Sequence, residues 1–250
     1  MTCKTVCCAG RTPALNHARH FLATAGVLVA ETPGWDTHHL LLDVPSFRPG
    51  LWTEEQLSTL LSSLPREVTI LGGNLHHPAL EGFRTVDLLQ DEGYLQENAV
   101  ITARCTVPIA EGLLKTPWEN LPVLIIGWGR IGKALAAMLK RKGCTVTIGS
   151  ETESHRLSAA EQGFFPADFR EMRKILPSFR LIVNTAPAPV LSEDEGALCR
   201  NCVKIDLASV KGMEGQDVVW ARALPGRYAP EASGQLIAET FLRRRKEAEK

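Results

Sequence analysis

Three glycines are the residues in this sequence whose spacing most directly indicates a chemistry. Gly127, Gly129 and Gly132 follow a run of four apolar residues and open an amphipathic stretch. In that setting the first glycine permits a tight turn, the second lets the backbone approach a pyrophosphate, and the third lets helix and strand pack closely. The N–H groups of the helix mouth, which includes Arg130 and Ile131, would hold the diphosphate. The pattern predicts a binding site for NAD or NADP.

A second group of polar residues follows the next apolar run. Ser150, Glu151 and Thr152 come directly after it. An acidic residue at this place usually accepts hydrogen bonds from the ribose hydroxyls and rejects a 2′-phosphate, but Glu151 lies one residue beyond the usual position, which Ser150 occupies. Ser150 and Thr152 could instead bind a phosphate, with His155 or Arg156 supplying charge. We favour NAD, and NADP stays open.

Two later apolar runs also end in polar loops. The first loop reads Asn184-Thr185-Ala186-Pro187 and the second Asp206-Leu207-Ala208-Ser209. In a doubly wound sheet, loops at the carboxyl ends of strands line the ligand crevice. We therefore expect Asn184, Thr185, Asp206 and Ser209 to face the nicotinamide half of the cofactor, and we add Ala186, Pro187 and Ala208 to the cofactor-binding candidates. Asp206 could equally be a carboxylate that caps its own turn.

Alternating strands and helices must position these loops. Residues 123–126 and 145–148 have the composition of buried strands, and residues 133–142 between them have helical spacing. This predicts an α/β fold with a doubly wound parallel sheet of Rossmann type, over residues 118–226. Residues 97–117 form a connecting segment, with an apolar helix over 97–115.

The first 96 residues repeat the same alternation on a smaller scale. Thr53 and Gln56 form a capping box that predicts the start of a helix ending near Leu64. Such alternation argues for parallel βαβ units, which makes residues 1–96 a separate α/β lobe. The strands are predicted over 5–9, 27–30, 39–44, 68–71 and 85–88, and a further helix over 14–25.

Composition excludes several classes of function. Lys plus Arg equals Asp plus Glu at 28 each, so the basic excess of a nucleic-acid surface is missing. No apolar run approaches the roughly 20 residues that span a bilayer, and the amino terminus does not resemble a signal peptide, so we expect a cytoplasmic protein. The seven cysteines include one isolated CxxC, Cys199 to Cys202. A zinc site needs a second ligand pair, so we expect no metal.

Several of these segments together resemble one family. The glycine motif, the Asn184 and Asp206 loops, residues 98–106 and the stretch Leu224–Leu236 are similar to the dipicolinate synthase A subunit, over about residues 97–241. Two of the motifs also resemble alanine dehydrogenases and transhydrogenases. The resemblance implies a flavodoxin-like first lobe and a last helix, over 227–250, that returns to it. It implies NAD(P)-linked oxidation of a cyclic dihydrodipicolinate-type precursor to dipicolinate in sporulation, together with a small B subunit.

A dicarboxylate substrate of that kind needs cationic and hydroxyl partners. Arg104 is our candidate carboxylate clamp, flanked by Thr102 and Thr106, and Arg227 is a further candidate. Asp206 and Ser209 are the catalytic candidates. We also expect a homo-oligomer.

Three departures from the family keep other functions open. Arg104-Cys105 replaces a Glu-Gly pair, Glu151 replaces a basic residue, and Gly212-Met213 replaces Gly-Gly. One alternative is a non-catalytic NAD(P)-binding regulatory subunit or redox sensor. Another is a D-2-hydroxyacid dehydrogenase, which would need an Arg where Ser209 stands and a later His that this chain lacks.

Overall fold

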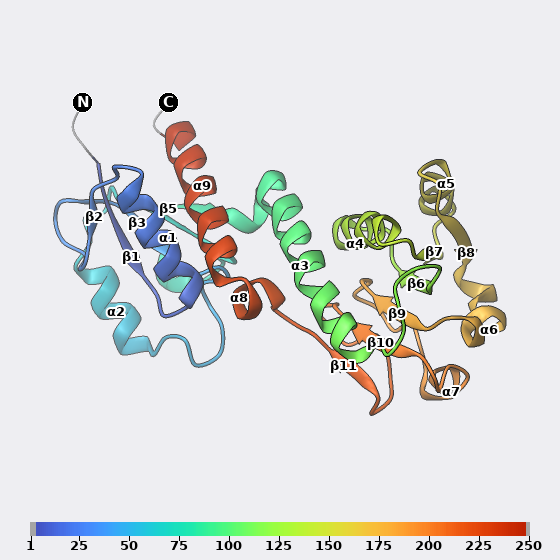
Figure 1. Cartoon of the computed structure of the whole chain (residues 1–250). Coiled ribbons are helices and arrows are strands. Elements are labelled where there is room, and N and C mark those ends of the chain that lie inside the picture. The colour runs from blue at the N-terminus through green and yellow to red at the C-terminus, as the bar shows by residue number, and fades with distance from the viewer. Residues whose placement is uncertain (1–3, 249–250) are drawn as a thin grey trace. The chain divides into compact units, whose positions relative to one another are not determined.

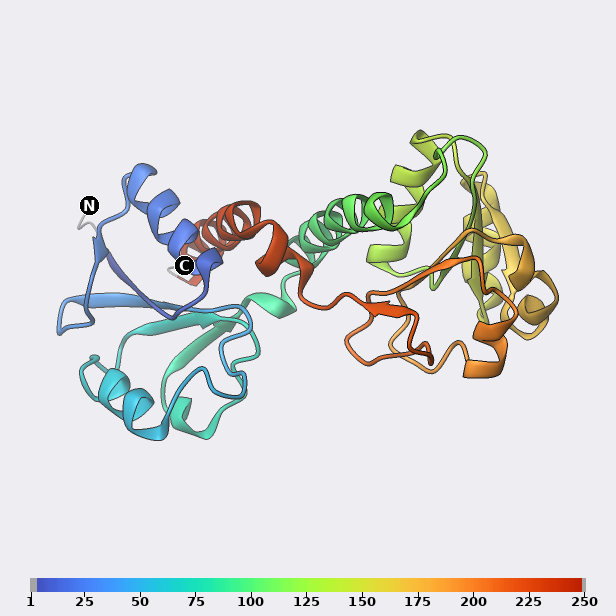
Figure 2. The ribbon, with the colours of Figure 1, turned by 60° about the horizontal axis from the view of Figure 1, so that its bottom comes forward.

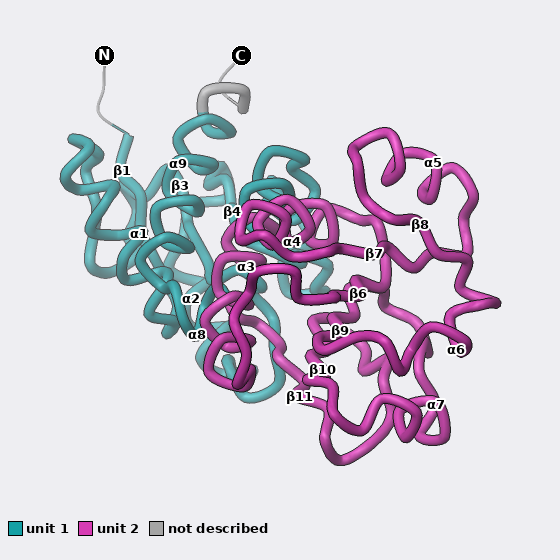
Figure 3. The backbone as a smooth tube through the Cα atoms, turned by 45° about the vertical axis from the view of Figure 1, so that its right-hand side comes forward, with its two compact units in different colours: residues 1–98, 225–250 teal, residues 99–224 magenta. Residues whose placement is uncertain are grey.

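The computed structural model describes residues 4–248, with side chains through residue 245, as two compact units. One unit joins residues 1–98 to residues 225–250, and the other comprises residues 99–224 (Figure 3). The long helix α3 (Glu92–Leu113) contains the boundary between them. Each unit has a parallel sheet of its own (Figure 1).

The first unit has a five-stranded sheet in the order β2-β1-β3-β4-β5. All neighbouring pairs are parallel. This is the flavodoxin order, in which the chain reverses direction across the sheet between β1 and β3. The predicted α/β lobe of flavodoxin-like type is confirmed. Its strands are β1 (Thr5–Ala9), β2 (Val29–Ala30), β3 (Thr37–Leu42), β4 (Thr69–Gly72) and β5 (Arg84–Asp87).

Helices cover both faces of this sheet because its strands are apolar on both sides (Figure 2). One face, with Cys7, Leu40 and Ile70, packs on Leu57 and Leu61 of α2 (Glu54–Ser62). The helices α1 (Pro13–Thr24) and α9 (Pro230–Ala248) pack together in the same unit. The predicted capping box of Thr53 and Gln56 is present at the start of α2. Short elements complete the unit: η1 (Pro78–Leu80), η2 (Leu88–Gln90) and α8 (Leu224–Tyr228), which begins at the boundary.

A buried carboxylate holds the turn between β1 and α1. Asp43 is fully buried and accepts hydrogen bonds from the backbone N–H groups of Arg11, at 2.9 Å, and Thr12, at 3.2 Å. The Thr12 hydroxyl also donates to it. A Cβ atom on Gly10 would lie 2.4 Å from one oxygen of this carboxylate, so the turn can approach Asp43 only because residue 10 is glycine.

The second unit has a six-stranded parallel sheet in the order β11-β10-β9-β6-β7-β8. Counted from β6, this is the Rossmann order, and the predicted doubly wound sheet is confirmed. The switch point lies between β6 and β9, where the strand order reverses. The strands are β6 (Pro122–Ile126), β7 (Thr145–Ser150), β8 (Phe165–Asp168), β9 (Leu181–Asn184), β10 (Val203–Asp206) and β11 (Val218–Trp220).

Alternation along the strands divides the core of this unit. Leu124 and Ile126 of β6 join Ile182 of β9 on one face, where they contact Met172 and Phe179. The helix α4 (Arg130–Arg141) packs against β6 and β7. The other helices are α5 (Glu153–Glu161), α6 (Met172–Ile175) and α7 (Glu193–Ala197), with the short turns η3 (Phe169–Glu171) and η4 (Leu176–Ser178).

Two sequence predictions differ from the structure. The helix predicted to begin at residue 97 begins at Glu92, because the Asp91 carboxylate caps it by accepting from the Tyr94 N–H at 2.8 Å. The last helix, predicted over 227–250, is divided: Leu224–Tyr228 forms the short helix α8, and α9 begins at Pro230. Across residues 4–248, no helix combines the length and the apolar character that crossing a bilayer requires.

Candidate functional site

Two of the three motif glycines stand where no side chain fits. Gly127, just after β6, has φ = 103°, and a Cβ atom there would lie 2.6 Å from the Thr185 hydroxyl. A Cβ atom on Gly132 would lie 2.3 Å from the carbonyl oxygen of Gly127. The turn therefore sits directly on the first turn of α4, as the spacing predicted.

The middle glycine faces open space. Gly129 is the N-cap of α4 in an extended conformation and supplies no side-chain cap hydrogen bond. Apart from its chain neighbours Trp128 and Arg130, no residue of the described chain has a heavy atom within 4 Å of a Cβ atom built there. The first-turn N–H groups of a helix lack intrahelical acceptors and carry its positive dipole end. The helix mouth therefore has both the donors and the room that a diphosphate needs.

A cavity of about 310 Å³ opens beside this helix mouth. It extends from the end of β7 to the loop after β9 and combines an apolar wall with few polar groups, as nucleotide sites do. The residues that line it and were predicted from the sequence are Gly127, Gly129, Ser150, Glu151, Thr152, Thr185, Ala186 and Pro187.

Other lining residues were missed. Phe169 follows β8, a strand that the sequence patterns did not indicate, and Pro189 and Val190 extend the β9 loop. Trp128, whose backbone belongs to the motif, turns its indole to Ser158, with 3.3 Å between Nε1 and Oγ. The signal for Phe169 was the alternation itself, since a Rossmann half needs a third strand after β7. The predicted residues Arg130, Ile131, Gly132, Asp206 and Ala208 are not among those lining the cavity.

The end of β7 is held by hydrogen bonds around Ser150. Its buried hydroxyl lies 3.4 Å from Nδ1 of His155 and 3.3 Å from the Thr152 N–H. Arg156 donates to the carbonyls of Ser150, at 2.7 Å, and Glu151, at 2.8 Å, and pairs with Asp168 at 3.1 Å. The guanidinium thus braces the turn. His155 is exposed and lines the cavity.

Asp206 binds its own loop. The carboxylate is fully buried and accepts from the N–H groups of Ala208, at 2.9 Å, Gly212, at 2.8 Å, and Met213, at 2.9 Å. The amide of Asn184 donates to it at 3.1 Å. Four donors occupy the two carboxylate oxygens, which is the turn-capping role that the sequence left open. Neither oxygen is therefore left to accept a proton from a reacting group.

The same network joins the β9 and β10 loops. Asn184 also accepts from the Ala186 N–H at 2.9 Å, and the Gly212 carbonyl accepts from Val190 at 2.7 Å. A Cβ atom on Gly212 would lie 2.2 Å from the Ala188 carbonyl oxygen. The Thr185 hydroxyl donates to the Ile126 carbonyl at 3.0 Å and so ties the β9 loop to the end of β6.

The predicted substrate residues on α3 do not form one cluster. Thr102 and Thr106 are buried, and the Thr106 hydroxyl donates to the Thr102 carbonyl at 2.9 Å. Arg104 is exposed. Residues four apart share a helix face whereas residues two apart do not, so Thr102 and Thr106 lie on a different face of α3 from Arg104. Ser209 and Arg227 are also exposed, and Arg227 belongs to the other unit.

The CxxC pair has the character of buried apolar side chains. Cys199 and Cys202 are both buried, and burial raises the pKa of Cys202 to about 12. A thiol, not a thiolate, therefore stands at this position, and thiolate is the form that attacks disulfides or binds metal. Among residues 4–248, no group of three His, Cys, Asp or Glu side chains is placed to hold a metal ion.

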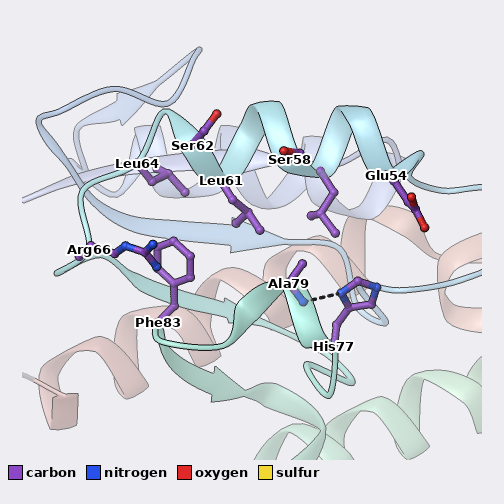
Figure 4. Close-up of a pocket in the computed structure, with 10 residues that line it drawn as sticks. Glu54, Ser58, Leu61, Ser62, Leu64, Arg66, His77, Ala79 and Phe83 are labelled. Carbon is purple, nitrogen blue, oxygen red and sulfur yellow. Dashed lines mark hydrogen bonds between the residues drawn. The ribbon is translucent and has the colours of Figure 1, made fainter.

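A larger cavity, of about 650 Å³, lies in the first unit along α2 (Figure 4). Leu61 and Leu64 lie on one side and Phe83 on the other, with the Arg66 guanidinium 5.4 Å from the Phe83 ring centre. His77 is stacked on Phe47 and accepts from the Ala79 N–H at 3.2 Å. No residue predicted as a site lines this cavity, so volume does not identify the functional site here.

Part of the second unit matches a known family model. Residues 118–190 match the family model "Acetohydroxy acid isomeroreductase, NADPH-binding domain". A comparison with curated protein sequences found no match.

Among solved structures, the chain is similar to the dipicolinate synthase A subunit from Bacillus halodurans, with a TM-score of 0.80, 20% identity and 97% of both chains covered. The corresponding dipicolinate synthase structure from Bacillus subtilis gives a TM-score of 0.77 at 18% identity, over 100% of this chain and 99% of that one. A transhydrogenase from Sinorhizobium meliloti gives 0.73 at 14% identity, over 98% and 84%. At these identities the likeness shows the fold, which is the one predicted from the motifs.

Proposed function

We propose that this chain is an NAD(P)-dependent oxidoreductase of the dipicolinate synthase A type. The observation that carries the proposal is the N-terminus of α4. There is free space beside Gly129, whereas Gly127 and Gly132 are packed so closely that no side chain would fit. A glycine turn without a ligand would have no need of that open space at the N-cap, where serine or aspartate would cap the helix better.

The side chains and backbone of the second unit divide the binding work. The first-turn N–H groups of α4 would hold the diphosphate, and a dinucleotide held there would supply hydride-transfer chemistry. Thr185 positions the β9 loop along the nicotinamide half, and Asp206 fixes the β10 loop that presents the exposed Ser209. Asp206 is in this proposal a positioning residue, and Ser209 is the hydroxyl offered to the substrate.

The residues at the end of β7 would determine whether a ribose 2′-hydroxyl or a 2′-phosphate is preferred. Ser150 rather than a carboxylate occupies the usual position, and its hydroxyl is turned inward to His155 and Thr152. Glu151 is exposed one residue further, at the cavity. A carboxylate there disfavours a 2′-phosphate, and Arg156 is already engaged in the turn, so we propose that NAD binds more tightly than NADP.

The substrate we propose is a cyclic dihydrodipicolinate-type dicarboxylate, oxidised to dipicolinate by loss of one hydride to the dinucleotide and one proton. Arg104 and Arg227, both exposed, are the candidate carboxylate partners. By analogy with the proteins it resembles, we further propose a cytoplasmic homo-oligomer that acts with a small flavoprotein-like B subunit in sporulation.

The test has two stages. Calorimetry with NAD(H) and NADP(H) measures binding, and binding of neither refutes the proposal at its base. The protein is then mixed with the oxidised cofactor and the aldolase-derived cyclic precursor, and the absorbance of reduced nicotinamide is followed. We expect it to rise. Binding without turnover would instead favour a non-catalytic regulatory subunit or redox sensor, which needs the helix mouth but no substrate groups.

A further inference from the structure

Trp220 is a side chain at the carboxyl edge of the second sheet that the function above does not use. It is the last residue of β11 and lies in register with Asp206 of β10. The residue is 41% exposed, although a tryptophan side chain offers a large apolar area for burial. The Arg222 guanidinium lies 4.9 Å from its ring centre. An exposed, braced tryptophan at this edge calls for an explanation.

The indole has one specific partner. Its Nε1–H donates to the carbonyl of Ala208 at 3.0 Å. Ala208 belongs to the β10 loop, and its N–H is held from the opposite side by Asp206 at 2.9 Å. The peptide groups on both sides of Ala208 are thus fixed, one by a carboxylate and one by an indole. The next residues, Ser209 and Val210, are exposed.

The strand order indicates which half of a bound dinucleotide would lie near the β10 loop. The β7 end of the cavity, with Ser150, and the β8 end, with Phe169, lie on one side of the switch point between β6 and β9. The strands β9, β10 and β11 lie on the other side. A diphosphate at the mouth of α4 divides the ligand at that point, so its two halves extend to opposite sides. With the adenosine half toward β7, the nicotinamide half runs toward the loop that Trp220 holds.

We propose that Trp220 is a positioning residue for the nicotinamide half, acting through the Ala208 carbonyl. It holds the segment 207–212 in the conformation that the nicotinamide meets, and it makes no contribution to the adenosine half. The proposal rests on the dinucleotide site proposed above. It assigns a role to a residue outside the glycine motif and outside the cavity.

The test compares a whole dinucleotide with its adenosine half. Trp220→Phe removes the indole donor and keeps an aromatic ring. Calorimetry should show that the reduced dinucleotide binds about three- to tenfold more weakly, which is the factor expected for one net hydrogen bond. The affinity falls because part of the binding free energy is then used to order the loop. ADP-ribose, which lacks nicotinamide, should bind with unchanged affinity.

Trp52→Phe is the matched control. Trp52 makes the same kind of bond, from its indole Nε1–H to the Ser46 carbonyl at 3.2 Å, in the other unit. Its loss should leave both affinities unchanged. Trp220→His, which keeps a ring N–H, should recover part of the lost affinity and serves as the second variant if the phenylalanine protein does not fold.

The outcomes separate the two proposals. If the native protein binds neither ligand, the dinucleotide site itself is refuted. If the native protein binds both, and Trp220→Phe weakens both equally or leaves the dinucleotide affinity unchanged, the site stands and the role of Trp220 is overturned. A loss confined to the whole dinucleotide supports the role, since general destabilisation would affect ADP-ribose as well.

Discussion

Placing a carboxylate at Gly129 should stabilise the protein while removing its ability to bind a dinucleotide. Gly129→Asp converts an N-cap without a side-chain hydrogen bond into one of the preferred capping residues. The backbone there, with φ = −79° and ψ = −170°, suits an aspartate, and apart from the two chain neighbours no residue of the described chain has a heavy atom within 4 Å of the new Cβ. Capping contributes a few tenths of a kcal/mol and the helix dipole about 0.3–1, so we expect a gain of roughly 0.5–1 kcal/mol.

The same carboxylate takes the diphosphate's place. It engages the N–H groups that would hold the phosphates and repels them electrostatically. Loss of two hydrogen bonds to a charged group, at roughly 1.5–3 kcal/mol each, should weaken binding by more than about 100-fold. Urea unfolding followed by circular dichroism measures the stability, and calorimetry with NADH and NADPH measures the binding.

Gly132→Ala is the contrasting variant within the same motif. Its Cβ atom would lie 2.3 Å from the Gly127 carbonyl oxygen, which is backbone and cannot move aside cheaply. Overpacking of this kind costs about 1–3 kcal/mol, so this variant should lose stability as well as binding. A Gly129→Asp protein that is less stable than the native one, or that keeps its dinucleotide affinity within about threefold, would contradict the site geometry.

Three further perturbations test other parts of the second unit and the buried thiols. Gly212→Ala should cost about 1–3 kcal/mol in urea unfolding, because its Cβ would lie 2.2 Å from the Ala188 carbonyl oxygen; an unchanged midpoint would contradict the packing of the two loops. Lys204 is 1% exposed and pairs with Asp217 at 2.5 Å. Asp217→Asn leaves a buried ammonium without its counter-charge, so it should destabilise the protein more than Lys204→Met, which removes the ammonium. The reverse order in the same assay would show that the unpaired charge does not determine the loss of stability. Burial raises the pKa of Cys8 to about 11 and that of Cys202 to about 12, both above the thiol value of 9.0 in the unfolded chain, so stability should be full below pH 9 and fall as the pH rises toward those values. Rapid reaction of the folded protein with a thiol reagent at neutral pH, at these two cysteines, would be the contrary result.

The sequence predicted those parts of the fold whose signals are local. The run of Val123 to Ile126, the glycine spacing and the periodicity of α4 lie within 20 residues of one another, and each constrains the next. The β6-α4-β7 unit and the glycine turn followed directly. Ser150, Glu151 and Thr152, which the distance from the motif singled out, line the cavity at the end of β7.

Long-range contacts could not be predicted from such local patterns. Whether Arg156 binds a ligand or braces its own turn depends on Asp168, which lies on a strand that the sequence patterns did not indicate. Asp206 could be recognised as a turn residue, but its partners Gly212 and Met213 follow only once the loop is folded. The separation of Arg104 from its threonine neighbours was available from helical geometry alone, because α3 was predicted as a helix and positions two apart face different ways.

Because of Asp43, the two sheets differ in whether the turn after the first strand can bind an anion from solution. The turn after β1 in the flavodoxin-type sheet and the turn after β6 in the Rossmann sheet are topological counterparts, each at its sheet's reversal of strand order. In the first, the chain has already supplied an anion of its own to the turn's N–H groups. The protein should therefore bind one equivalent of dinucleotide in a titration, although each of its two sheets has a turn at the reversal of strand order.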